Sequence, residues 1–322
     1  MKILITGAAG FLGSRLIQSL LAGHPDLPEV ARVVAADLAE CPLDDPRIES
    51  RTGTIMDRDF VRAIVDDDVD VIYHLAAVLS GQSEAEFDLG MQVNVDATRV
   101  LLEACRRLEK APRFIFTSSL AVFGGELPDV VPDDHVPRPQ SSYGAEKAIA
   151  ELFVSEYSRR GFVDGIVCRL PTISVRPGRP NAAASSFVSG IIREPLSGVE
   201  SVCPVPLETR LWISSPAVAV RNLVHAAGLE ASALNGERTL NLPGLTVTAS
   251  EMLESLERLA GPDARARVRY DEDPRVRDIV CSWPGAFDVR RALSFGFEAD
   301  PDFDSVLHQY MGELAADSPE TI

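Results

Sequence analysis

The sequence predicts an α/β protein with a doubly wound parallel sheet and a smaller C-terminal domain. Three observations lead to this fold class. Short apolar runs alternate with helix-period segments over the first 170 residues, a glycine-rich turn follows the first apolar run, and the pattern changes after residue 170. A chain of 322 residues has the length of one or two domains.

The apolar runs of the first half have the length of buried strands, and the segments between them have the period of helices. The expected strands are Ile3–Thr6, Arg32–Ala36, Val69–His74, Phe114–Thr117 and Gly165–Leu170. The expected helices are Phe11–Leu21, Ala97–Leu108 and Tyr143–Ser158. Right-handed crossovers wind such units into an open sheet with helices on both faces.

The second half has a different character, because prolines recur through residues 171–216 and the helical segments are shorter. We therefore expect residues 1–170 to form the sheet domain. Residues 171–322 are expected to form mainly a smaller domain over the carboxyl edge of the sheet, with some exchange of chain between the two.

The charge and the cysteines limit the classes of partner. A formal charge of −17 repels phosphate backbones and anionic lipid, so no nucleic-acid or membrane partner is expected. No apolar run approaches the ~18 residues that span a bilayer. Met1 and Lys2 lead directly into an apolar run without the features of a signal peptide, so no secretory leader is expected. The five cysteines are scattered, which favours reduced thiols and a cytoplasmic location. The histidines have no metal-ligand spacing, so no metal is expected.

Gly7, Gly10 and Gly13 follow the first strand and open the first helix. In a Rossmann-type fold the first glycine permits the tight turn, and the second lets a pyrophosphate approach the helix N-terminus. The third allows helix and strand to pack closely. The loop therefore predicts a dinucleotide site.

Asp37 ends the second expected strand. A carboxylate at this place accepts hydrogen bonds from the adenosine ribose and repels the 2′-phosphate of NADP. Leu38 follows it, and no arginine lies beside it. NAD is therefore the expected cofactor, and the alternative role for Asp37 is to cap a loop or helix.

Tyr143 and Lys147 lie four residues apart on an expected helix, so both project from one face. Oxidation of an alcohol needs a base for the hydroxyl proton while hydride leaves the same carbon. A free tyrosine, with a pKa of ~10, is a poor base, but a neighbouring ammonium and a positive nicotinamide favour the phenolate. We expect Tyr143 to be this base and Lys147 to hydrogen-bond the nicotinamide ribose. The alternative is a surface tyrosine packed along a lysine stem.

With these residues the chain resembles the extended short-chain dehydrogenases, the NAD-dependent epimerase/dehydratase family. The resemblance extends over the whole chain, and the motifs that carry it occur in the family's order. They are Thr6–Gly13, His74–Ala77, Asn94–Thr98, Phe116–Ser119 and Tyr143–Lys147.

The resemblance implies further cofactor contacts and the role of one serine. The additional cofactor residues that it implies are Phe11, Leu12, Thr54, Ile55, Leu75, Ala76, Ala77, Asn94 and Thr172. Thr54 replaces the family's usual aspartate, a departure that bears on the hydrogen bond to adenine. Ser119 corresponds to the residue that hydrogen-bonds the reacting oxygen, although a serine ending a strand is the simpler alternative. Leu120 and Ala121 replace the Asp-Glu pair of the family's dehydratases, so dehydration is not expected, and His74 is expected to be structural.

Residues after the sixth expected strand depart from the nucleotide-sugar members. Segments 171–178, 183–187 and 282–285 instead resemble a bacterial subgroup associated with D-erythronate dehydrogenase. A sugar acid requires a guanidinium for its carboxylate and polar partners for its diol. Ser119 and Tyr143 are the expected contacts of the substrate's reacting hydroxyl. The candidates for the carboxylate are Arg176, Arg179 and Arg210, and those for the diol are Ser80, Asn181 and Ser186. Arg210 is the favoured clamp, and a surface ion pair is the alternative for each arginine.

The expected function is NAD-dependent oxidation of a small 2-hydroxy sugar acid, with D-erythronate to 2-dehydro-D-erythronate as the best candidate. A nucleotide-sugar 4-epimerase or reductase is the first alternative, and a non-catalytic NAD-binding sensor is the second.

A homodimer is also expected. The apolar stripe of the Ala97–Leu108 helix and the Ala148 and Leu152 face of the Tyr143 helix are candidates for a two-fold helical interface, as in family members. The alternative is that both stripes face the sheet.

Overall fold

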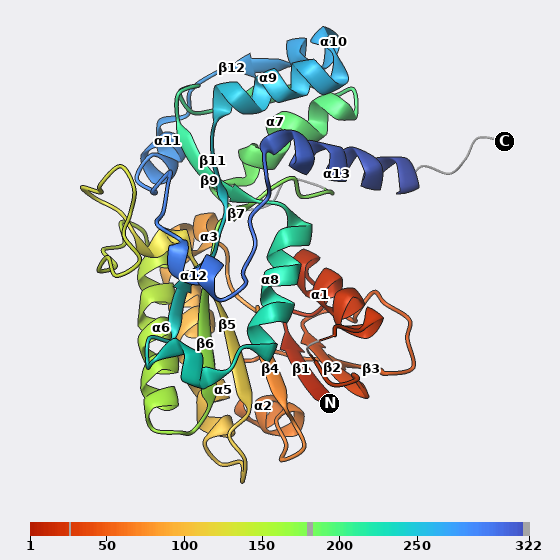
Figure 1. Cartoon of the computed structure of the whole chain (residues 1–322), viewed down its shortest axis with the longest axis vertical. Coiled ribbons are helices and arrows are strands. Elements are labelled where there is room, and N and C mark those ends of the chain that lie inside the picture. Colours follow the sequence, from red (N-terminus) through yellow and green to blue (C-terminus); the bar gives the residue numbers. More distant parts are fainter. Residues whose placement is uncertain (26, 179–182, 318–322) are drawn as a thin grey trace, which may run out of the picture.

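The computed structural model describes residues 1–25, 27–178 and 183–317, and its centre is a seven-stranded parallel sheet (Figure 1). The strand order is β10-β6-β5-β4-β1-β2-β3. The strands are β1 (Lys2–Thr6), β2 (Arg32–Asp37), β3 (Ile48–Thr52), β4 (Val71–His74), β5 (Arg113–Ser119), β6 (Asp164–Leu170) and β10 (Thr239–Asn241). The chain runs from β1 to one edge and from β4 to the other, so a ligand crevice is expected where these two strands end. The predicted fold class is confirmed.

Helices cover both faces of this sheet because successive residues of a strand point to opposite sides. Ile3 and Ile5 pack with one set of helices, and Leu4 packs with the other. The first set is α1 (Phe11–Ala22), α8 (Pro216–Gly228) and α12 (Arg290–Ser294). The second set is α2 (Arg58–Ile64), α5 (Ala97–Cys105) and α6 (Ser142–Arg159).

A smaller layer stands above the sheet in Figure 1 and has its own apolar core. Its strands form one group in the order β11-β9-β7 and a pair, β12-β8. They are β7 (Thr172–Ile173), β8 (Ser201–Cys203), β9 (Arg210–Ser214), β11 (Leu245–Thr248) and β12 (Val268–Tyr270). Its helices are α7 (Ser186–Leu196), α9 (Ala249–Ala260), α10 (Pro262–Ala266), α11 (Pro274–Val280) and α13 (Phe303–Asp317). Short segments complete the fold: α3 (Ser80–Ala85), α4 (Phe87–Gly90), the π-helix η1 (Met91–Asp96), and the 3₁₀ turns η2 (Leu120–Val122) and η3 (Ala231–Leu234).

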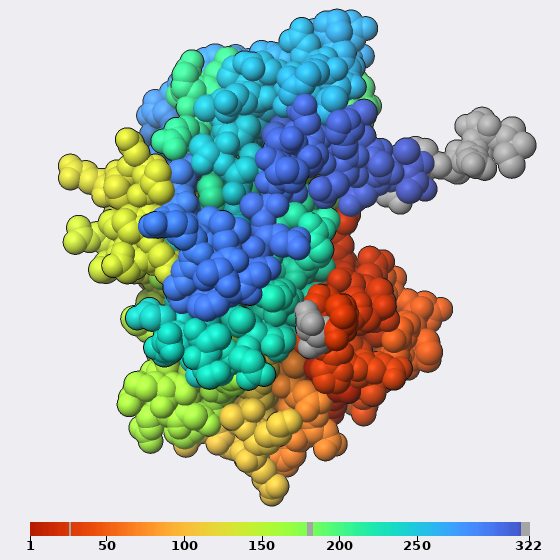
Figure 2. Space-filling view, viewed as in Figure 1, coloured from red at the N-terminus to blue at the C-terminus, as the bar shows by residue number. Residues whose placement is uncertain are grey.

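The chain beyond residue 170 contributes to both layers. β10 pairs with β6, with Leu240 opposite Cys168, and α8 packs against α1. In Figure 2 the cyan-to-blue segments form the upper part and also cover the front of the larger sheet. The assignment of cofactor binding to residues 1–170 and of substrate binding mainly to 171–322 stays a prediction.

The stripe predicted on the Ala97 helix lies against the sheet. Ala97 and Leu101 are almost completely buried in the core of that face, which is the alternative that periodicity left open. On α6, by contrast, Leu152 is 71% exposed. In the part of the chain that the structure describes, no helix is long and apolar enough to cross a membrane.

Candidate active site

An open cleft of ≈ 600 Å³ lies at the carboxyl ends of the central strands. Most residues predicted to bind the cofactor line it. They are Gly7, Gly10, Phe11, Leu12, Gly13, Asp37, Thr54, Ile55, Leu75, Ala76, Ala77, Tyr143 and Lys147. Asn94 and Thr172 do not line this cleft; Thr172 lines the neighbouring cavity described below. The structure thus brings the glycine loop and the Tyr143 helix to the same cleft.

The start of α1 is held against the turn that precedes it. A Cβ atom at Gly13 would overlap the carbonyl oxygen of Gly7, so only glycine permits this approach. The amide of Gly7 donates to the carbonyl of Ala36 at the end of β2 (3.0 Å). The glycine loop therefore packs against the end of β2, and its other side faces the cleft. A pyrophosphate at the N-terminus of a helix requires this open approach.

Asp37 is placed at the edge of the same cleft. Its Oδ2 accepts from the amide of Ala9 (3.0 Å), and its Oδ1 accepts from the amide of Leu38 (2.6 Å). The carboxylate therefore ties the glycine loop to β2. Oδ1 also accepts from the amide of Ala39 (3.3 Å). Three of the carboxylate's roughly four acceptor sites are therefore used, and the remaining one, on Oδ2, is available to a ribose hydroxyl.

Tyr143 reaches the cleft because α6 begins there. The Ser141 hydroxyl caps the helix by accepting from the amide of Gly144 (3.2 Å). A Cβ atom at Gly144 would overlap the carbonyl oxygen of Ala121, so glycine lets the first turn of α6 touch η2. This contact brings the phenol of Tyr143 to the hydroxyl of Ser119, with which it forms a hydrogen bond.

Lys147 lies one turn further along α6 and is almost completely buried. Its ammonium donates to the carbonyl of Thr117 (2.9 Å) and lies 4.7 Å from the centre of the Phe116 ring and 5.7 Å from that of Tyr143. An ammonium has three protons, so two donors remain for a ligand in the cleft that the residue lines.

The residues around Tyr143 do not by themselves favour its phenolate, the form for which a neighbouring ammonium and a positive nicotinamide were expected to act together. Burial and the nearby Glu146 carboxylate raise the pKa of Tyr143 to about 12, against the opposing effects of Arg176 and the Ser119 hydrogen bond. Burial also lowers the pKa of Lys147 to about 8, although Glu146 and Glu151 oppose this shift. The polypeptide therefore holds Tyr143 as a phenol, and a positive charge at the nicotinamide position is needed to favour the phenolate.

Glu146 is fully buried between the predicted catalytic pair and Asn94. Its Oε2 accepts from Nδ2 of Asn94 (2.6 Å) and from the hydroxyl of Ser83 (3.0 Å). Asn94 also holds Val78, accepting from its amide (2.8 Å) and donating to its carbonyl (3.1 Å). Asn94 thus fixes the wall of the cleft from behind. No sequence pattern pointed to Glu146, because its burial depends on the packing of three helical segments.

His74 has the structural role that was expected. Its Nδ1 is 2.7 Å from the Thr6 hydroxyl, and its Nε2 is 2.9 Å from the Thr98 hydroxyl. Thr98 already donates to the carbonyl of Asn94 (2.8 Å), so His74 donates from Nε2. Burial, together with Lys147, lowers the pKa of His74 to about 3, and the ring is neutral.

A second cavity of ≈ 140 Å³ adjoins the cleft. Leu79, Ser118, Tyr143, Leu170, Ile173 and Arg176 line both. Of the predicted substrate residues, Ser80, Ser119, Tyr143 and Arg176 line this cavity. Within the described chain, no carboxylate forms an ion pair with the Arg176 guanidinium. Burial and the charge of Arg193 lower the pKa of Arg176. An anion in the cavity would compensate this charge.

The remaining predicted substrate residues lie elsewhere. Arg210 is exposed and lines neither cavity, and Ser186 lines neither. Arg179 and Asn181 lie outside the described residues. Trp283 and Ser185 line the second cavity without having been predicted to do so. Trp283 comes from a segment whose resemblance to the subgroup was noted, and this was the available signal.

The comparisons with known proteins agree with this geometry. The model of the NAD dependent epimerase/dehydratase family matches residues 3–227. The chain belongs to this family. The predictions of the family, of an enzyme and of NAD as its cofactor are therefore confirmed. The cleft fits NAD, because it joins a glycine-lined helix start, the Asp37 carboxylate and the buried ammonium of Lys147.

Individual relatives are similar over almost their whole length. The D-erythronate dehydrogenase of Cupriavidus necator is 54% identical over 319 residues, covering 97% of this chain and 98% of the relative. That of Haemophilus influenzae is 45% identical over 317 residues, covering 97% and 99%. A crystal structure from Agrobacterium tumefaciens, described as a nucleoside-diphosphate-sugar epimerase, is 40% identical, with a TM-score of 0.92 over 99% of this chain and 95% of that one.

Proposed function

We propose that this chain oxidises D-erythronate at C2 to 2-dehydro-D-erythronate with NAD as the acceptor. The observation that carries the proposal is the small cavity beside the cofactor cleft, where Tyr143 and the guanidinium of Arg176 line the same space. Two relatives of 54% and 45% identity that are named D-erythronate dehydrogenase support the choice of acid.

The size of the cavity favours a small substrate. Its ≈ 140 Å³ is below the roughly 300–1,000 Å³ of pockets that hold drug-sized ligands. Arg176 supplies two parallel donors for a carboxylate, and Ser80 adds a hydroxyl at the wall. A four-carbon acid anchored by its carboxylate presents C2, the adjacent carbon, next to the anchor.

The proposed chemistry moves one proton and one hydride. Bound NAD⁺ supplies the hydride acceptor for the hydrogen on C2. Tyr143, as the phenolate that a positive nicotinamide would favour, would accept the proton of the C2 hydroxyl and become the phenol, and Ser119 would orient the same substrate oxygen by hydrogen bonding. Lys147 holds positive charge beneath the tyrosine and donates to the ribose. Because burial raises the pKa of Tyr143 to about 12, the positive nicotinamide is required to make this tyrosine a base.

A nucleotide-sugar epimerase is the second candidate. The Agrobacterium structure described in those words, at 40% identity and a TM-score of 0.92, favours it. Steady-state NADH formation with a panel of tetronates and UDP-sugars separates the candidates. The proposal expects NADH from D-erythronate and neither NADH formation nor epimerisation with UDP-sugars. Turnover of UDP-sugars alone would establish the second candidate, and NAD binding without any turnover would establish a sensor.

We further propose a cytoplasmic homodimer that uses the exposed face of α6. The side chain of Leu152 is 71% exposed, so it is available to pack against a second copy of the chain. The five free cysteines support a reducing location. On α5, Ala97 and Leu101 are not available for such a contact, because both are buried against the sheet. Light scattering at micromolar concentration tests the assembly: a dimer mass that Leu152→Glu reduces to a monomer mass is expected, and a monomeric wild type rejects it.

A further inference from the structure

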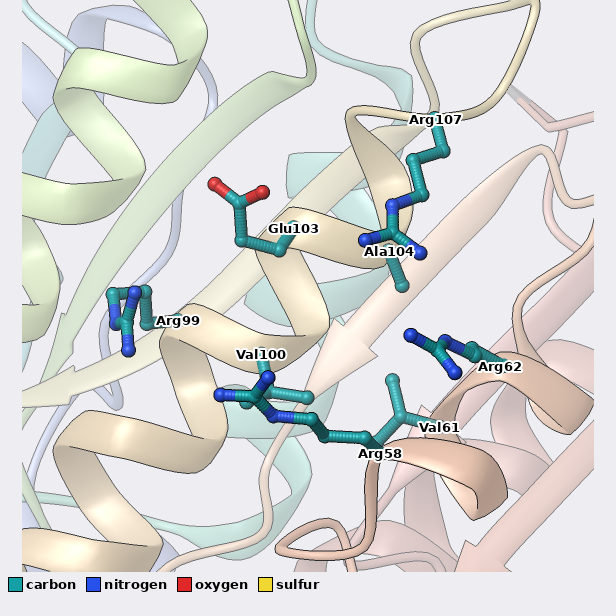
Figure 3. Close-up of a pocket in the computed structure, with 8 residues that line it drawn as sticks. All are labelled: Arg58, Val61, Arg62, Arg99, Val100, Glu103, Ala104 and Arg107. Carbon is teal, nitrogen blue, oxygen red and sulfur yellow. The ribbon is translucent and has the colours of Figure 1, made fainter.

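A hollow of ≈ 180 Å³ lies between α2 and α5, apart from the two cavities of the active site (Figure 3). Four arginines rim it: Arg58 and Arg62 from α2, Arg99 from α5, and Arg107 just beyond the end of α5. Val61, Val100 and Ala104 form an apolar floor. In Figure 3 the side chains of Arg58, Arg62 and Arg107 extend into the space between the two helices.

The charges of this rim are largely uncompensated. Arg62 pairs with the exposed Asp59 (3.0 Å). Among the residues that the structure describes, no carboxylate forms an ion pair with Arg58, Arg99 or Arg107. Positive charge gathers at this hollow although the whole chain carries −17, so the net charge of the protein does not explain the grouping.

The acidic side chain at the rim does not neutralise the arginines. Glu103 accepts from Nη2 and Nε of Arg106 (2.7 and 3.1 Å) and from the hydroxyl of Tyr157. Its charge is therefore balanced mainly by Arg106, which does not line the hollow, and its attraction to Arg107 is the smaller effect. Three positive charges remain around one concave, partly apolar surface.

We propose that this hollow is a second ligand site, which binds a small anion carrying two or more negative charges, such as a phosphate ester or a polycarboxylate. Guanidinium groups bind phosphate and carboxylate oxygens through paired, planar hydrogen bonds. Several guanidiniums on two helices favour an anion that accepts from both, and the apolar floor accommodates a short carbon skeleton.

The site is also connected to the cofactor cleft through the chain. Thr54, Ile55 and Met56 line the cleft, and α2 begins two residues later at Arg58. Val93 lines the cleft from η1, which continues directly into α5. An anion that draws α2 and α5 together therefore acts on two segments of the cofactor cleft wall, so its occupancy is expected to change the affinity for NAD.

Calorimetric titration of NAD-saturated protein with inorganic pyrophosphate, and separately with citrate, tests this proposal, because bound NAD keeps the glycine loop from competing. We expect saturable binding of at least one of them at one site per chain, weakened by added salt. Binding of both indicates recognition of charge, and binding of pyrophosphate alone indicates a phosphate ligand. Arg58→Gln and Arg107→Gln should each weaken binding about tenfold, the effect of ~1.4 kcal/mol.

Arg275→Gln is the matched control, since Arg275 is an arginine on α11 with a 90% exposed side chain and should leave the affinity unchanged. The absence of saturable binding overturns the proposal, as does wild-type affinity in both hollow variants or an equal loss in the control. If light scattering shows that the hollow variants reduce the mass of the assembly while neither probe binds, the arginines contact a second copy and the proposal is wrong.

Discussion

Replacement of Arg176 by alanine should raise the KM for D-erythronate by about ten- to a hundredfold. The guanidinium lines both the cofactor cleft and the small cavity, and within the described chain no carboxylate pairs with it. A charge-assisted contact of this kind contributes ~1.5–3 kcal/mol, and ~1.4 kcal/mol corresponds to tenfold in affinity. The upper part of the range is expected, because burial and Arg193 already disfavour the charge of Arg176 and a substrate carboxylate relieves that cost.

The same substitution should change the pH dependence. Arg176 lowers the pKa of Tyr143, so its removal raises that pKa further. The tyrosine then loses its proton at a higher pH. kcat measured near neutrality should fall, and it should recover partly as the pH rises toward 8, the value above which Lys147 loses its charge. Arg176→Lys should restore part of the KM effect and most of the pH effect, because lysine keeps the charge but lacks the planar pair of donors.

The assay is steady-state NADH formation over a range of D-erythronate concentrations, with the Kd for NAD measured in parallel. Arg210→Ala is the matched control, because this exposed arginine lines neither cavity, and Arg179→Ala belongs in the same series. A raised KM in Arg210→Ala together with a normal KM in Arg176→Ala would refute the reasoning and restore Arg210 as the carboxylate ligand.

Three further outcomes are expected. Tyr143→Phe should lower kcat by ~10²-fold or more with little change in NAD affinity by fluorescence titration, and wild-type turnover would exclude Tyr143 as the base. Wild-type kcat/KM should fall above about pH 8. The pKa of Lys147 is about 8, so its positive charge is lost as the pH rises through that value. A pH profile of kcat/KM that stays flat well above pH 8 contradicts the role of Lys147. Asp37→Ala should narrow the preference for NAD over NADP in kcat/KM and weaken both cofactors, because Asp37 also holds the amide of Ala9 (3.0 Å); a wild-type preference for NADP would contradict the assignment.

The parts of the fold that follow from local patterns were predictable from the sequence. Strands β1, β2, β4, β5 and β6 are apolar runs buried on both faces, and all five were expected. β3 was not expected, because this edge strand is largely exposed and reads Ile-Glu-Ser-Arg-Thr. β10 was missed because it is three residues long and joins the sheet from beyond residue 170.

The site divides in the same way. The glycine loop and the Tyr143–Lys147 pair depend on spacing within one turn or one helix, so sequence spacing predicted that they meet in one cleft. The positions of Arg176, Arg210 and Trp283 depend on how the smaller layer packs over the sheet, and spacing does not contain this information. The raised pKa of Tyr143 likewise depends on Glu146, whose burial requires α3, η1 and α6 to pack together.

The central claim is that hydride passes from C2 of a sugar acid to NAD, and transfer from D-erythronate deuterated at C2 tests it most directly. The NADH produced is isolated, and its molecular mass is measured by mass spectrometry. The account predicts that the reduced cofactor carries one deuterium and that the product is 2-dehydro-D-erythronate. Reduced cofactor without deuterium, or no reduced cofactor from D-erythronate at all, would contradict it.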